Sequence, residues 1–183
     1  INNLIRIVKS NKIFVTAVAL IILFFSYLFI PNIFNQNEVE KELKNKLFTK
    51  FKLNLDFSNK LNYKFFPKPH FVTEGISISY DENEISKINN LKIYISPKNL
   101  FSLSDINVND VIFEGANFYL NKENYNFFIN ILDNNFFESS LQLINSNIFY
   151  RNIESEVLFI NKIFKMRYYY DEKKSNNIVY SEN

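Results

Sequence analysis

The spacing of apolar residues divides the chain into three zones, and the first is a continuous apolar run. Within residues 13–30 the polar side chains are those of Thr16, Ser26 and Tyr27. As a helix this run would be about 27 Å long, at roughly 1.5 Å of rise per residue. A bilayer core is roughly 30 Å thick. The run is therefore predicted to be a transmembrane helix.

Two other interpretations of this run were weighed. A buried helix of a soluble protein seldom stays free of charge over so many residues. A cleaved signal peptide usually has a shorter apolar region followed by a cleavage site of small residues. Here the sequence PNIF follows, without an Ala-x-Ala pattern. We therefore expect a signal anchor that is retained.

The flanking charges predict the orientation of this anchor. Arg6, Lys9 and Lys12 precede the run, and after it no basic residue appears until Lys41. Because basic residues favour the cytoplasmic side, residues 1–12 are expected in the cytoplasm and the rest of the chain across the membrane. In a Gram-negative bacterium that location is the periplasm, reached by a single pass through the inner membrane.

The second zone has the spacing of an amphipathic helix. Between residues 38 and 50, Val39, Leu43 and Leu47 recur at every fourth position, which places them on one helical face. Acidic residues come early in this segment and lysines late, as the helix dipole favours. Residues 31–50 are accordingly expected to be an amphipathic helical linker.

In the third zone the apolar period changes from about four to two, which indicates β-strands. Strands are expected at residues 51–58, 61–66, 74–80, 88–96, 106–108, 111–120, 141–143, 148–151 and 157–165, with a short helix after residue 121. Short strands at this spacing favour an antiparallel meander. Residues 51–183 are thus predicted to form a mainly β domain with a few helices, built on an antiparallel curved sheet.

Three of these strands alternate strictly and are expected to share one apolar face. Its members are Phe51, Leu53, Leu55, Phe57, Ile76, Ile78, Tyr80, Leu91, Ile93 and Ile95. Alternation shows that one face is buried but does not say against what. The face could pack on the 38–50 helix or on a second sheet as an ordinary core, or it could remain open and bind an apolar ligand.

Composition and motifs indicate no catalytic chemistry. The chain has no cysteine and a net charge of +2, so neither a thiolate metal site nor a nucleic-acid partner is expected. The one histidine, His70, has no catalytic partner at sequence level. Asp105, Asp110 and Glu114 lack the register of a calcium loop, and two glycines cannot make a phosphate-binding loop. We expect no enzyme activity, no catalytic residue, no metal and no cofactor.

The order of these segments resembles the N-terminal region of the AsmA family. The resemblance is carried by the anchor, the short helix ending near Thr49, and then KLNLDF, FFPKPHF, EGISISY, NNLKIYISPKNLFSLSDINVNDVIFEGANFYLNKENYNFFINIL and LQLINSNIFYRN. It rests on a pattern of residue types over nearly the whole chain. The departures are Lys50-Phe51 in place of Gly-Arg, Asn126-Phe127 in place of Asn-Trp, and Asn145-Ser146 in place of Asn-Gly.

This resemblance implies a role in phospholipid transport between the inner and outer membranes and in outer-membrane assembly. It implies a repeating β-groove, with membrane phospholipids and outer-membrane or periplasmic proteins as partners. The ten alternating residues named above are then candidates to line the groove. Because relatives are usually several times longer, the chain is expected to be the N-terminal piece of a larger protein.

One alternative stays open beside this interpretation. A non-transporting anchored protein, such as a cell-division or secretion-apparatus subunit, would share the layout of an anchor followed by a β domain. An anchored enzyme is disfavoured, because the chain has no recognisable catalytic motif.

Overall fold

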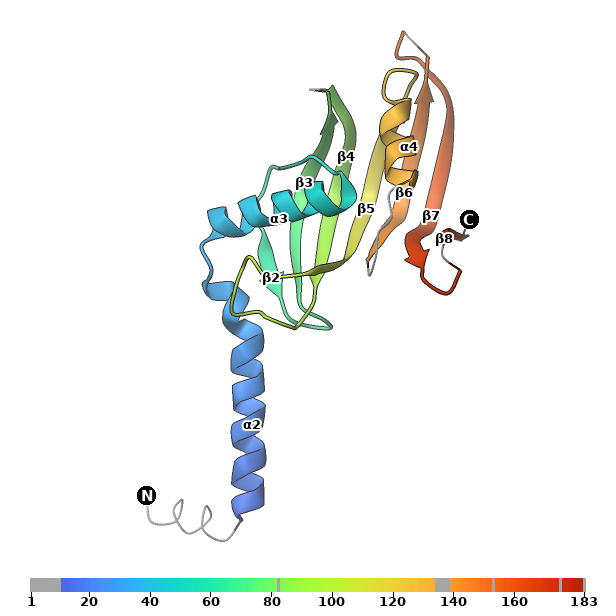
Figure 1. The fold of residues 1–183 in the computed structure, drawn as a ribbon. Coiled ribbons are helices and arrows are strands. Elements are labelled where there is room, and N and C mark those ends of the chain that lie inside the picture. Colours follow the sequence, from blue (N-terminus) through green and yellow to red (C-terminus); the bar gives the residue numbers. More distant parts are fainter. Residues whose placement is uncertain (1–10, 82, 134–138, 153, 175, 183) are drawn as a thin grey trace.

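The computed structural model describes residues 11–81, 83–133, 139–152, 154–174 and 176–182. In it a long helix leads into one curved β-sheet (Figure 1). The helices are α2 (Lys12–Phe29), the 3-10 turn η1 (Ile30–Ile33), α3 (Gln36–Phe51) and α4 (Tyr125–Asp133). The strands are β1 (Leu55–Phe57), β2 (Asn62–Lys64), β3 (His70–Tyr80), β4 (Asn83–Ile95), β5 (Val108–Leu120), β6 (Ser140–Arg151), β7 (Val157–Asp171) and β8 (Asn176–Glu182).

The described strands form a single sheet in the order β1-β3-β4-β5-β6-β7-β8, with β2 also paired to β3. Most neighbours are antiparallel, as predicted, but β5 and β6 run parallel. This pair corrects the expected meander. Parallel neighbours need a crossover of about a dozen residues or more, and residues 121–139, which contain α4, supply it.

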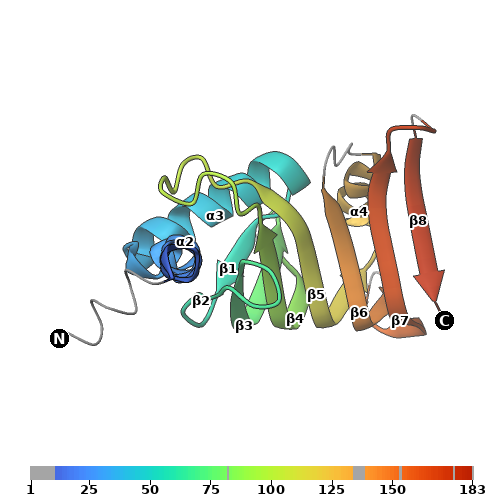
Figure 2. The ribbon, with the colours of Figure 1, turned by 90° about the horizontal axis from the view of Figure 1, so that it is seen from below.

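Both helices of the domain lie on the same face of the sheet (Figure 2). In Figure 1, α3 crosses the strands nearest the anchor and α4 lies over the later ones. We call the face that carries them the inner face and the opposite one the outer face. The inner face holds a single apolar cluster that joins the buried residues of α3, α4 and the sheet.

The strands are longer than the alternation predicted. Segments 106–108 and 111–120 merge largely into β5, and segments 141–143 and 148–151 lie in β6. Strand β7 continues through the aromatic run at residues 166–170, and β8 was not predicted at all. The breaks in alternation that suggested separate strands lie inside continuous ladders.

The first residue of the predicted 51–58 strand belongs to a helix instead. Phe51 is the last residue of α3, and β1 begins only at Leu55. The reason is that Phe51 extends the four-residue spacing of the buried stripe Val39, Leu43 and Leu47. Lys52 then takes a left-handed conformation with a φ of 58° and ends the helix.

A row of residues across the sheet, several of them in left-handed conformation, explains the breaks in alternation. We call this row the crease. Gly75 in β3 and Gly115 in β5 have φ values of 65° and 67°, and Asn145 in β6 has 47°. In the pairing register these three residues and Asn89 of β4 fall in one row. At this row each strand shifts its alternation by one residue, so that Thr73 is buried before the crease and Ile76 after it. The same face therefore stays buried on both sides of the crease.

Candidate membrane and lipid contact sites

Helix α2 is long and apolar enough to cross a membrane. The candidate span covers Lys12–Ile33 and is almost entirely exposed. An exposed helix of Ile, Leu, Val and Phe is unfavourable in water, which is consistent with a single membrane span. Of the predicted topology determinants, Lys12 begins α2, whereas Arg6 and Lys9 lie outside the described residues.

Two tyrosine hydroxyls fasten the end of α2 to the β domain. The Tyr27 hydroxyl donates a hydrogen bond to the Pro97 carbonyl oxygen at 2.7 Å and accepts one from the Leu100 N–H at 3.1 Å. The Tyr63 hydroxyl, from β2, donates to the Leu28 carbonyl oxygen at 2.8 Å. Burial raises the pKa of the Tyr63 phenol to about 12, and the neighbouring Tyr27 hydroxyl adds to the rise. Tyr63 thus keeps its proton and remains a donor at neutral pH.

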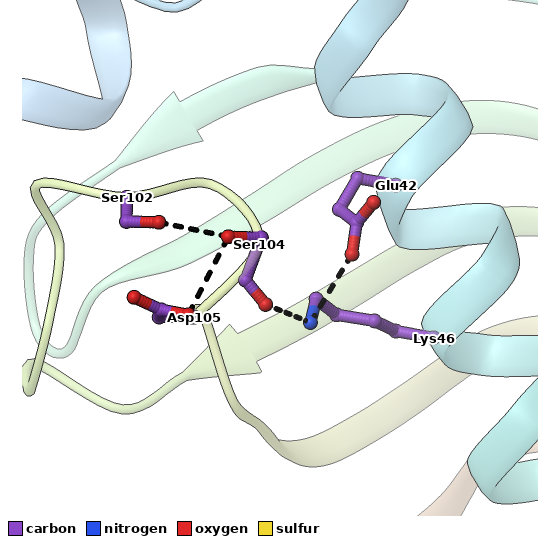
Figure 3. A network of polar contacts seen from close by, with 5 residues as sticks. All are labelled: Glu42, Lys46, Ser102, Ser104 and Asp105. Carbon is purple, nitrogen blue, oxygen red and sulfur yellow. Dashed lines mark hydrogen bonds and ion pairs between the residues drawn. The ribbon is translucent and has the colours of Figure 1, made fainter.

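The 96–107 loop, which receives Tyr27, is also held by α3. The Lys46 ammonium donates to the Ser104 carbonyl oxygen at 2.7 Å and lies 3.2 Å from the Glu42 carboxylate (Figure 3). The Ser102 and Ser104 hydroxyls are 2.9 Å apart, and Asp105 accepts a further hydrogen bond from Ser104 at 3.4 Å. These contacts hold the loop between the anchor and the sheet.

The residues predicted to line a lipid groove form an ordinary core in this part of the sheet. Eight of the ten are buried in the cluster beneath α3: Phe51, Leu53, Leu55, Ile76, Ile78, Leu91, Ile93 and Ile95. Phe57 and Tyr80 are half-buried against the same cluster. The strand residues among them share one face, as expected, and Phe51 packs onto that face from α3. In this structure α3 covers the face, which is the ordinary core that the sequence left open beside a lipid groove.

Helix α3 closes this face because its own apolar stripe matches it. Leu43, Leu47 and Phe51 have no exposed surface. Burying an aliphatic or aromatic side chain contributes about 1.5–3 kcal/mol, so the stripe stabilises α3 on the sheet by several kcal/mol. An acyl chain would have to displace that helix to reach Leu91 or Ile93.

Between α3 and α4 the inner face carries a cleft of about 580 Å³. Phe48 of α3, Tyr80 of β3 and Phe127 of α4 give it apolar walls. Lys52 and Asp133 also line it. The cleft marks the place where cover by α3 ends and cover by α4 begins.

The sheet becomes uncovered at β7 and β8. Val157, Leu158, Phe159 and Ile160 are four consecutive apolar residues with 47% to 64% of their surface exposed. Pairing puts Phe159 opposite Tyr150 and Ile160 opposite Phe149, so the segment exposes apolar side chains on both faces. Phe164, farther along β7, and Val179 of β8 are also exposed. We call Val157–Ile160 the exposed β7 segment.

The signal for this surface was present in the sequence as a break in pattern. Residues 157–160, VLFI, are all apolar, whereas a strand with one solvent-exposed face should alternate apolar and polar residues. A run of four exposed apolar residues is unfavourable in a soluble domain unless it has a role. Residues 157–165 were predicted only as a strand, and the exposed apolar surface was not predicted.

His70, the one histidine of the chain, is held by contacts within the domain. His70 is buried, its Nδ1 lies 2.7 Å from the Lys68 carbonyl oxygen, and its ring stacks on Tyr94. Its contacts are those of a structural side chain. No group of three or more metal-ligating side chains occurs within the part of the chain that the structure describes.

Comparison with known proteins gives a match to a family model. The model of the AsmA family matches residues 8–148, which is more than half of the chain. The matched part runs from the start of the anchor into β6. No curated protein matches the chain.

Proposed function

The chain belongs to the AsmA family, and from this premise we propose that it takes part in phospholipid transport between the inner and outer membranes of a Gram-negative bacterium, and so in outer-membrane assembly. In this proposal α2 anchors the chain in the inner membrane. The β domain lies in the periplasm and contacts the acyl chains of phospholipids.

The anchor supports the first part of the proposal. Helix α2 is apolar and exposed, and its outer end is bonded to the β domain through Tyr27 and Tyr63. The basic residues Arg6, Lys9 and Lys12 precede the helix, and basic residues favour the cytoplasmic side. The sheet then begins directly at the outer surface of the membrane.

The physical cost of lipid transfer explains what the sheet must provide. Exposing apolar groups costs about 0.8 kcal/mol per methylene, so two tails of about 14 methylenes would cost about 20 kcal/mol in water. A carrier must replace most of that lost contact with apolar surface of its own. A sheet with exposed phenylalanine, leucine and isoleucine can do so.

The observation that carries the proposal is the exposed β7 segment. Near α2, α3 covers the inner face and the residues beneath it are buried, whereas at β7 four successive apolar residues are exposed. We infer that lipid contact begins where helical cover ends. The 51–120 part of the sheet then serves as a cap that closes the groove on the side of the membrane.

A protein partner is the competing occupant of the same surface. An anchored interaction protein would also present apolar residues on an exposed strand. Family membership favours lipid, and the experiments below separate the two.

The proposal is tested by following labelled phospholipid from the inner to the outer membrane in cells that lack the protein. Full-length wild type should restore the flux. The double variant Phe159→Asp with Ile160→Asp should not, because carboxylates on this surface repel acyl chains. The control is Asn161→Asp with Lys162→Asp, which puts the same side chains at the next two exposed positions and should restore the flux.

Both variants must accumulate in the inner membrane, and alkaline phosphatase fused after Lys50 should be active there. An inactive fusion would contradict the periplasmic location. Full restoration of flux by the Phe159→Asp, Ile160→Asp variant would contradict lipid contact at the exposed β7 segment.

A further inference from the structure

Two loops of the β domain lie beside the outer end of α2. The 65–69 loop follows β2, and the 96–107 loop follows β4. Both occur at the end of the sheet from which α2 leaves (Figure 1). The Phe65 ring packs against Phe25 and Phe29 of α2 at 6.2 Å and 4.8 Å, and Phe101 of the other loop packs against Tyr27 at 5.1 Å.

These contacts occur at a depth that a membrane would occupy. A layer roughly 30 Å thick corresponds to about 20 helical residues, which from Lys12 reaches about residue 32. Residues 25–29 of α2, which the loops touch, lie within the outer part of that layer. The loops therefore descend to the level of the lipid headgroups or below.

Each loop has a highly exposed phenylalanine at this level. Phe66 is 78% exposed and Phe101 is 73% exposed. The Phe101 side chain extends from a loop that is otherwise fixed, since its neighbour Leu100 is fully buried and bonded to Tyr27. A fixed loop that holds an apolar ring outward is unfavourable in water and favourable in a bilayer.

The charges beside these rings suit a lipid surface. Lys64, Lys68 and Lys98 lie in or next to the loops, and residues 64–69 and 96–101 contain no acidic residue. The three lysines are exposed and form no ion pair among the described residues. Lysines near a membrane surface are attracted to anionic lipid headgroups, and aromatic side chains concentrate in the interfacial layer.

We propose that the 65–69 and 96–107 loops form a membrane-contact platform, in which Phe66 and Phe101 insert among the acyl chains beside α2 and the three lysines contact lipid phosphates. The inference rests on the proposed anchoring by α2. Its consequence is that the β domain is seated on the membrane at a fixed angle, and does not swing on a flexible stalk.

The test uses the absence of tryptophan from the chain. Single tryptophans are introduced into the full chain by Phe66→Trp, Phe101→Trp, Phe24→Trp and Tyr125→Trp, all at exposed aromatic residues. Each protein is reconstituted into vesicles of phosphatidylcholine and phosphatidylglycerol whose acyl chains carry bromine, a short-range quencher. Phe24→Trp reports insertion of α2, and Tyr125→Trp on α4 is the matched exposed control, because it lies outside both the loops and the β7 and β8 surface.

We expect Phe66→Trp and Phe101→Trp to lose most of their fluorescence, as Phe24→Trp does, while Tyr125→Trp keeps its own. If Phe24→Trp is quenched but Phe66→Trp and Phe101→Trp match Tyr125→Trp, the platform is overturned and the anchor stands. If Phe24→Trp is not quenched, the anchor fails and the platform fails with it.

Discussion

Three residues in left-handed conformation determine which side chains reach the inner face. Gly75, Gly115 and Asn145 lie in one row across the sheet, and the alternation of each strand shifts there. The buried Ser146 hydroxyl closes the crease beside Gly115 by accepting from the Ala116 N–H at 3.2 Å and donating to the Ile144 carbonyl oxygen at 3.0 Å. The crease lets long strands stay apolar on one face despite a break in period.

The left-handed conformation at Gly115 and Asn145 predicts different effects on stability for substitutions at these two positions. Gly115→Ala should lower the free energy of unfolding by about 1–3 kcal/mol, because alanine is strained at this φ and its Cβ would lie 2.6 Å from the Asn89 amide nitrogen. Asn145→Gly should leave stability unchanged or raise it by up to about 1 kcal/mol, since glycine adopts the conformation freely. Chemical denaturation of the purified protein in detergent measures both. Equal destabilisation by the two changes would show that the left-handed conformation is not what these positions require.

At the scale of elements, the position of the helices determines whether an apolar strand face is buried as core or remains exposed. The same kind of face is closed where α3 covers β1, β3 and β4, and open where β7 extends past α4. The junction between α2 and the loops is the second determining feature, because two tyrosine hydroxyls and four phenylalanine rings take part in the contacts that join α2 to the β domain.

The junction can be tested through Tyr27. Tyr27→Phe removes the hydrogen bonds to Pro97 and Leu100, each of which contributes about 0.5–1.5 kcal/mol. Hydrogen exchange in the 96–107 loop should therefore accelerate by roughly tenfold or more, measured by mass spectrometry on the full chain. Tyr125→Phe, a change at an exposed tyrosine of α4, is the matched control and should leave this loop as it is. Unchanged exchange in Tyr27→Phe would mean that the anchor does not hold the loop.

The sequence predicted the helices and strands better than it predicted which of them pair or pack together. The apolar run of α2, the four-residue stripe of α3 and the alternation of β3 and β4 are local patterns, and all three elements are present. The parallel pairing of β5 with β6 depends on a crossover, and the cover of Leu55 by Leu43 and Leu47 depends on two segments meeting in space. Alternation carries neither kind of information, so it could not decide between a lipid groove and an ordinary core for these residues.

On the scale of the whole molecule, the chain runs from an exposed apolar anchor through a covered sheet to an uncovered one. The part nearest α2 is covered by α3 and bonded to α2, and among the described strands large exposed apolar side chains occur only on β7 and β8. In the proposed function, this order keeps the membrane end of the sheet covered and leaves apolar surface at β7 for lipid contact.

The most direct test of this account is photo-crosslinking in living cells, with a photoreactive amino acid placed at one position at a time in the full chain. We predict phospholipid adducts at Phe159 and Ile160 on the exposed β7 segment. None is expected at Leu55 or Ile93, which lie under α3, or at Lys162, a polar exposed position on the same strand. Phospholipid adducts at Leu55 and Ile93, with none at Phe159 and Ile160, would contradict it and show that α3 opens to admit lipid.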